Sequence, residues 1–164
     1  CIQKNVHFTI IGTGPFKEKY RNYLIKNDID GLFSFVGIVD NTNLYYQNCD
    51  FLISTSKLEG LPTVLIEALC YSKPVISSFQ RSALEIMIEK NFNFEDLKQK
   101  IINNFIKLKV GYVYSLGNTK QLSDSIISMI EEGKKDFLNI DNNSKNMLNK
   151  FSLNNFFKYV DLIK

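Results

Sequence analysis

Two glutamates eight positions apart are the residues of this sequence best suited to chemistry. Glu59 and Glu67 flank the turn Gly60-Leu61-Pro62, and both stand in an otherwise apolar stretch. A carboxylate accepts hydrogen bonds from sugar hydroxyls but repels a phosphate placed directly against it. The spacing therefore favours a pair of acids that hold hydroxyls at the two ends of an extended ligand, with the anionic centre of the ligand between them.

The segment between the two acids has the character of an anion site. Residues 60–64 run directly into a predicted helix over 62–72, with Pro62 in the first turn, where a missing amide hydrogen has no cost. The free N–H groups of such a helix start and the positive end of its dipole favour a diphosphate. Glu67 lies about 6 Å further along the axis than Thr63, within reach of two ribose hydroxyls. The plainer alternative is a surface helix with a first-turn acid and an ordinary exposed glutamate.

Strands and helices in alternation would position this segment. Apolar, strand-like runs are separated by helical stretches, as expected when helices cover both faces of a parallel sheet. The order predicts a doubly wound α/β fold. The strands are expected within 6–15, 33–39, 49–56, 73–78 and 110–115, and the intervening helices near 16–27, 41–48, 62–72 and 83–89.

The second half of the chain is predicted to be mostly helical. Apolar residues recur every three or four positions in 90–109, which predicts an amphipathic helix that looks like an insertion. Another helix is expected over 119–133, with Thr119 as its cap and Gly133 as its stop. Two further helical stretches are expected in the tail, 142–164.

The carboxyl ends of the strands are where an open parallel sheet binds its ligands. Three segments reach that edge, at residues 12–15, 36–38 and 56–64. The first has two glycines of the dinucleotide fingerprint, but Lys17 stands where a third glycine is needed. A tight turn is therefore predicted there, and a nicotinamide cofactor is not.

Composition and charge exclude several classes of function. Twenty basic and seventeen acidic residues give a net charge of +3 without a long basic run, so nucleic acid is not expected as a partner. One histidine, His7, and three cysteines at unsuitable spacings argue against a metal, and the cysteine count suits a reducing compartment. No apolar run reaches the roughly 18 residues of a membrane span. No signal peptide or initiator methionine opens the chain, so we expect a piece of a longer protein.

An ordered set of segments in this chain resembles a known enzyme family. IIGTGP, FVGIV, NCDFLISTS and EGLPTVLIEALCYSKPVISS are similar to the C-terminal domain of retaining glycosyltransferases of the GT-B fold, family 4 or "group 1". The likeness covers residues 6–89, and less clearly 110–130, and the pair Glu59 and Glu67 is its most specific part. It implies a Rossmann-like, doubly wound half of a two-domain enzyme, with extra C-terminal helices, that binds a nucleotide-diphosphate sugar.

The resemblance also implies roles for individual residues. Glu67 is expected to bind the ribose, and Glu59 is the candidate catalytic residue, which lies by the donor sugar and orients and stabilises it without acting as a nucleophile. No metal or other cofactor is implied. The remaining donor contacts are expected at Gly60, Leu61, Pro62, Thr63 and Val64 for the sugar and diphosphate, at Gly12 and Gly14, and at Val36, Gly37 and Ile38, whose backbone would hold the base.

The partners that the resemblance implies include parts that this chain lacks. An N-terminal domain would precede Cys1 and supply the acceptor site and the basic pair that neutralises the diphosphate. Residues 1–164 would then be a single donor-binding domain, inactive alone. The parent enzyme would act in the cytoplasm, at the inner face of the membrane with possible peripheral association, on a saccharide or lipid-linked acceptor of a surface polysaccharide. The Gly-rich turn common in relatives is replaced here by residues 79–86.

Two other functions fit the same residues. The chain could be a nucleotide-sugar-binding module that has no activity of its own and works beside an acceptor-binding subunit. It could also belong to a nucleotide-sugar epimerase or a phosphorylase of the same fold.

Overall fold

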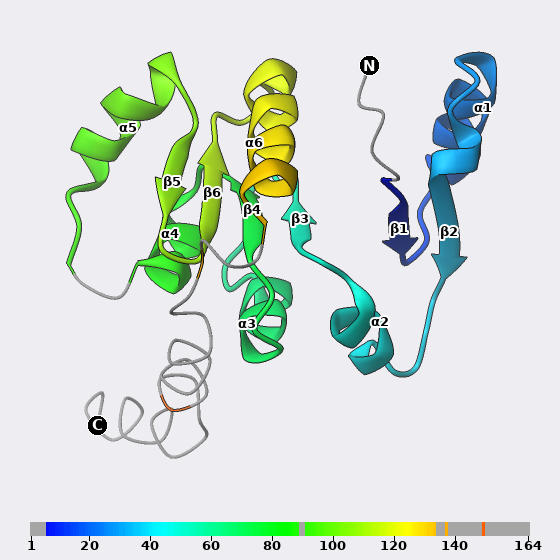
Figure 1. Ribbon diagram of the computed structural model, residues 1–164, viewed down its shortest axis with the longest axis horizontal. Helices are drawn as coiled ribbons and strands as arrows, with labels where there is room; N and C mark the ends of the chain where they lie inside the picture. Colours follow the sequence, from blue (N-terminus) through cyan, green and yellow to red (C-terminus); the bar gives the residue numbers. More distant parts are fainter. Residues whose placement is uncertain (1–5, 89–90, 134–136, 138–148, 150–164) are drawn as a thin grey trace. The chain divides into compact units, whose positions relative to one another are not determined.

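The computed structural model describes residues 6–88, 91–133, 137 and 149, and divides into two compact units, Cys1–Leu44 and Tyr45–Lys164 (Figure 1). Each unit is described by itself. Apart from Asn149, the helical stretches predicted for the tail lie outside the described residues.

The first unit is built on one pair of parallel strands joined through a helix. Phe8 of the first strand is in register with Phe33 of the second, and their rings stack with centroids 4.9 Å apart. His7 Nε2 bonds to Ser34 Oγ at 2.8 Å, which explains a histidine beside this strand. The elements are β1 (Phe8–Ile11), α1 (Lys17–Lys26), the short 3-10 helix η1 (Asp30–Leu32) and β2 (Phe33–Gly37).

The second unit contains a four-stranded sheet in the order β3-β4-β6-β5. The first three strands are parallel, and β5 runs antiparallel to β6. The fold is therefore α/β with parallel strands, as the sequence predicted. The elements are α2 (Asn43–Asn48), which crosses the boundary between the units, β3 (Leu52–Ser54), α3 (Thr63–Cys70), β4 (Val75–Ser78), α4 (Arg81–Met87), α5 (Phe94–Asn103), β5 (Ile106–Leu108), β6 (Gly111–Tyr114) and α6 (Thr119–Glu132).

Helices cover both faces of this sheet. Successive residues of a strand point to opposite faces, so Val75 and Ile76 of β4 belong to two different clusters. Val75 packs in a cluster with side chains of α3, α4 and α5. Ile76 packs in another with Tyr112 of β6 and Met129 of α6, and Figure 1 shows α6 running along β4 and β6. The buried strand β4 therefore forms the centre of the unit.

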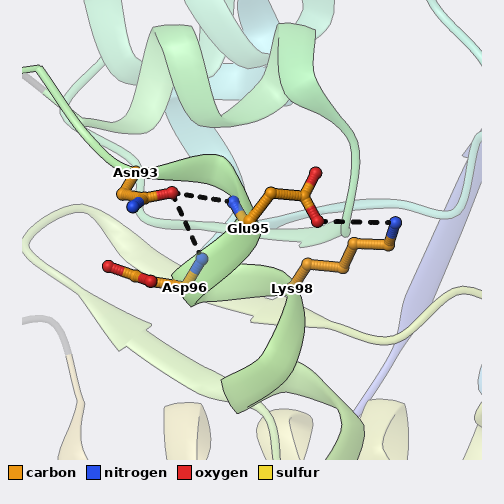
Figure 2. A network of polar contacts seen from close by, with 4 residues as sticks. All are labelled: Asn93, Glu95, Asp96 and Lys98. Atoms are coloured by element: carbon orange, nitrogen blue, oxygen red, sulfur yellow. Dashed lines mark hydrogen bonds and ion pairs between the residues drawn. The ribbon is translucent and has the colours of Figure 1, made fainter.

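The predicted helix over 90–109 is shorter than expected, and its last residues form a strand. Asn93 caps α5, because its Oδ1 accepts hydrogen bonds from the amides of Glu95 at 3.1 Å and Asp96 at 3.4 Å (Figure 2). The helix ends after Asn103, where the chain becomes extended. Residues 106–108 alternate in side-chain direction and pair with β6, which local helical periodicity could not reveal.

The predicted cap of α6 is wrong by one residue. Asn118, and not Thr119, occupies the N-cap, and its Oδ1 accepts a hydrogen bond from Gln121 N at 3.0 Å. Both residue types are good caps, so a sequence pattern cannot easily choose between neighbours. The predicted stop is confirmed, since Gly133 is the C-cap with φ +71.

An ion pair joins the antiparallel edge of the sheet to the end of α6. Lys107 of β5 lies 2.6 Å from Glu132, which also accepts a hydrogen bond from the Tyr112 hydroxyl. Burial alone would raise the pKa of Glu132, but the hydrogen bonds from Lys107 and Tyr112 outweigh it, so the pKa lies below its usual value. The charged carboxylate therefore favours the folded state.

Replacing Glu132 by glutamine should produce a pH-dependent loss of stability. A carboxyl with a lowered pKa contributes stability above its unfolded pKa, and this contribution is lost as the pH falls through the folded value. The deficit of Glu132→Gln should therefore be largest near neutral pH and shrink below the usual value of 4.5. Urea unfolding at several pH values measures this, with the exposed neighbour Glu131→Gln as control. A deficit that stays constant with pH would contradict the assignment.

Gly111 is required by the close approach of β4 and β6. Its φ is +147, and a Cβ built there would lie 1.8 Å from the carbonyl oxygen of Val75. Gly111→Ala should therefore lower the free energy of unfolding by more than about 3 kcal/mol. Gly133→Ala is the matched control, because it shares a positive φ but meets no atom within 4 Å, and should cost only about 1 kcal/mol. Chemical denaturation of both variants tests the difference, and equal losses would show that the contact with Val75 is unimportant.

Candidate functional site

The loop between β3 and α3 is held in place by side chains of the segment 78–82, which leads from the last residue of β4 into α4. Glu59 N donates to Gln80 Oε1 at 3.0 Å, and the Glu59 carbonyl accepts from Ser82 Oγ at 2.8 Å. The Ser56 carbonyl accepts from Ser78 Oγ at 2.5 Å and, at the longer distance of 3.5 Å, from Gln80 Nε2. The backbone around Glu59 is therefore fixed to the centre of the sheet.

The helix that follows this loop begins where the sequence predicted, within one residue. Pro62 is the N-cap, one position before the expected first turn, because its ψ of 83° is not helical. Its carbonyl accepts a hydrogen bond from Leu65 N at 3.0 Å. The amides of Thr63 and Val64 then have no partner within the helix. Both residues are exposed, and α3 has no acidic residue in its first turn to occupy these donors or oppose an anion.

Glu67 lies about one turn further along α3 and is paired with a tyrosine that the sequence did not single out. The hydroxyl of Tyr46 in α2 is hydrogen-bonded to the Glu67 carboxylate. Tyr46 is buried, and its ring stacks on that of Tyr71 with centroids 5.6 Å apart. Burial first, and then the bond and the charge of Glu67, raise the pKa of the Tyr46 phenol strongly. The tyrosine is therefore a hydrogen-bond donor at any physiological pH and can orient the carboxylate.

Gly12 and Gly37 lie together at the carboxyl ends of β1 and β2. Gly12 N donates to the Gly37 carbonyl at 2.7 Å, and the two φ angles are +112° and +85°. Both are in the left-handed region that glycine adopts without strain. Gly14, Val36 and Ile38 flank this pair, and the Ile38 side chain is 80% exposed. A role for Val36, Gly37 and Ile38 in binding the base, and for Gly12 and Gly14 in binding the donor, stays a prediction.

The predicted site residues thus belong to two groups. The first unit brings together the glycine turns after β1 and β2, and the second contains Glu59 in the loop before α3 and Glu67 within α3. Within 6–88 and 91–133 no group of three or more His, Cys, Asp or Glu side chains could hold a metal ion. None of the helices in those ranges is long and apolar enough to cross a bilayer.

Comparison with known sequences decides the family. The sequence profile of the family described as "Glycosyl transferases group 1" matches residues 1–132, which is most of the chain. The chain belongs to this family. Sequence relatives of the chain include a glycosyltransferase of Methanocaldococcus jannaschii, 34% identical over 109 residues, or 58% of this chain and 30% of the relative.

A second relative has a more specific name. It is the GalNAc-alpha-(1->4)-GalNAc-alpha-(1->3)-diNAcBac-PP-undecaprenol alpha-1,4-N-acetyl-D-galactosaminyltransferase of Campylobacter jejuni, 33% identical over 90 residues, which are 55% of this chain and 24% of that protein. This group 1 chain therefore spans less than a third of the length of either relative.

Solved structures of glycosyltransferases with the GT-B fold share the architecture of the chain. One of them is TarM, of which a variant from S. aureus has also been solved. TarM has a TM-score of 0.73 at 20% identity, with 96% of this chain and 28% of TarM covered. HepE of Anabaena, solved in complex with UDP and glucose, has a TM-score of 0.69 at 19% identity, with 96% of this chain and 40% of HepE covered. At these identities the likeness establishes the fold, which is the one that the sequence predicted.

Removing only the hydroxyl of Tyr46 tests its contact with Glu67. Tyr46→Phe keeps the ring that stacks on Tyr71, so it should lower the free energy of unfolding only by the value of one hydrogen bond to a charged group. That value is at most about 1.5 to 3 kcal/mol, and solvent reduces it here because Glu67 is partly exposed. Tyr46→Leu, which also removes the stacked ring, should lose more. Urea unfolding measures both. The assignment would be wrong if Tyr46→Phe were as stable as the wild type.

Proposed function

We propose that this chain is the nucleotide-sugar donor-binding domain of a retaining glycosyltransferase. The observation that carries the proposal is the arrangement around α3, in which a fixed loop with Glu59 leads into a helix start that has no side-chain cap hydrogen bond, and then to Glu67. Membership of the group 1 family supports it. The complex of HepE with UDP, a protein of the same fold, supports a nucleotide diphosphate as part of the ligand.

Each part of the α3 segment would have one task in donor binding. The amides of Thr63 and Val64 at the helix start would donate to the diphosphate, where the helix dipole also favours negative charge. Glu67 would accept hydrogen bonds from the ribose hydroxyls, with its carboxylate oriented by Tyr46. Glu59 would orient the donor sugar and stabilise positive charge that develops at the anomeric carbon.

The proposed reaction transfers the sugar with retention at the anomeric carbon. The bond from that carbon to the diphosphate oxygen breaks, the acceptor hydroxyl forms the new bond on the same face, and its proton leaves with the diphosphate. The negative charge of the leaving group would be met by the start of α3 and by basic residues of a preceding domain. No metal is needed for these steps in the proposal.

One relative bears on the acceptor that we propose. The Campylobacter relative is named for an undecaprenol-linked glycan, which supports a saccharide or lipid-linked acceptor and a role in surface polysaccharide synthesis for the parent protein. We propose that the parent enzyme acts in the cytoplasm, at the inner face of the membrane.

A second candidate is a binding module without activity of its own. The groups around α3 support it as well, because all of them are assigned to donor binding and none is assigned as a nucleophile. A module that binds donor sugars beside a separate acceptor-binding subunit would keep the same site around α3.

Substituting Glu67 tests the nucleotide site directly. Glu67→Ala should weaken UDP binding by about 1 to 3 kcal/mol, because hydrogen bonds between a charged group and the ribose are lost. Isothermal titration calorimetry with UDP, GDP and ADP measures this and identifies the base. The matched control is Glu95→Ala, an exposed acid at the start of another helix, which should bind as the wild type does. Unchanged nucleotide affinity in Glu67→Ala would remove its assigned role.

A further inference from the structure

Both backbone groups of Glu59 are bound by side chains, and both side chains come from the short segment 80–82. Gln80 accepts from the Glu59 amide, and Ser82 donates to the Glu59 carbonyl. Gln80 is only 8% exposed, and its Nε2 donates to the Ser56 carbonyl. Backbone groups in loops commonly bond to water, and here a buried side chain, Gln80, and a half-buried one, Ser82, bind them instead.

The segment that holds Glu59 is itself supported from its other side. Two other residues of the segment 78–82, Phe79 and Arg81, contact the ring of Phe94. The ring centroids of Phe79 and Phe94 are 5.1 Å apart, and Arg81 Cζ lies 4.8 Å from the Phe94 centroid. Phe94 is the first residue of α5, whose start is fixed by the Asn93 cap (Figure 2). The segment 78–82 therefore lies between the Glu59 loop and the predicted insertion helix.

Fixing both backbone groups of one residue restricts the direction of its side chain. The N–H and C=O of Glu59 belong to the two peptide planes that meet at its Cα, so binding both limits φ and ψ and hence the Cα–Cβ direction. A carboxylate that starts from a fixed Cα loses fewer conformations when it binds a ligand. Loop residues seldom have this restriction, whereas functional groups benefit from it.

We propose that Gln80 and Ser82 are positioning residues that aim the Glu59 carboxylate at the sugar half of the donor. The inference rests on the proposed function, because it takes Glu59 as the residue beside the donor sugar. It predicts that these two side chains matter for binding the sugar of the donor and not for binding its nucleotide. Loss of either side chain should weaken the contribution of the sugar to binding and leave the nucleotide contribution at Glu67 and the α3 start intact.

The test compares UDP with UDP-sugars on the full chain. The probes are UDP, UDP-glucose, UDP-galactose and UDP-N-acetylglucosamine, and the sugar contribution is the ratio of the UDP dissociation constant to that of the tightest UDP-sugar. Gln80→Met is near in size and removes both polar atoms. We expect it to reduce the sugar contribution about tenfold, and to change UDP affinity less than about twofold.

The chain offers a matched control for each substitution. Gln121 is as buried as Gln80, at 6% exposed, and likewise bridges two backbone groups, Ser115 N and the Ile101 carbonyl. Gln121→Met should leave the sugar contribution unchanged. Ser82→Ala should reduce it and Ser82→Thr, which keeps a hydroxyl, should restore it. Circular dichroism and thermal unfolding establish that each variant is folded, and Ser82→Ala carries the test if Gln80→Met does not fold.

Two further measurements separate a failed inference from a failed function. Amide hydrogen exchange without nucleotide should show protection of the Glu59 amide in the wild type and its loss in Gln80→Met. Glu59→Gln should reproduce the selective loss, and combining it with Gln80→Met should add little, because both act through one carboxylate.

Each outcome then decides one of the two claims. Equal losses for UDP and UDP-sugars in Gln80→Met, or no loss, would overturn the positioning role while the nucleotide site stands. A wild type that binds UDP with no gain from any of the sugars would overturn it as well. A wild type that binds none of the UDP-sugars and none of UDP, GDP and ADP would overturn the proposed function and the inference together.

Discussion

The burial of β4 on both faces is the constraint on which the second unit depends. Val75 packs against α3 and its neighbours, and Ile76 packs against β6 and α6, so the strand is enclosed from both sides. The strand also pairs with β3 and with β6, and the approach of β6 is so close that only glycine fits at position 111. A strand that is buried and paired in this way is held firmly in place. The segment 78–82 begins at the carboxyl end of this strand.

The candidate site is an extension of the same core. Ser78 ends β4, and the next residues reach the loop before α3 through their side chains. The helix that follows this loop buries Leu65, Ala68 and Leu69 against β4, which holds its start in place. The apolar packing of α3 against β4 thus supports the groups of the same helix that we propose bind the donor.

Much of the fold could be predicted from the sequence because its signals are local. Apolar runs such as 73–78 and periodic stretches such as 119–133 become β4 and α6 nearly within their expected bounds. The strand β5 was missed because three residues after a helix carry too short a pattern, and only pairing with β6 determines them. The pair Glu59 and Glu67 could be proposed from spacing and resemblance, and its role stays a prediction. Tyr46 and Gln80 could not, because their bonds join residues 21 positions apart in both cases and leave no trace in local sequence.

The short strand β5 also bears on how the protein behaves at high concentration. It is one of the two edge strands of the four-stranded sheet in the described part of the chain, and such a strand offers unpaired amides and carbonyls to other molecules. Here it extends over only Ile106–Leu108, and the charged Lys107 stands at its middle. A short edge strand with a charged residue is a poor template for strand addition by another molecule, so this edge of the sheet resists uncontrolled self-association.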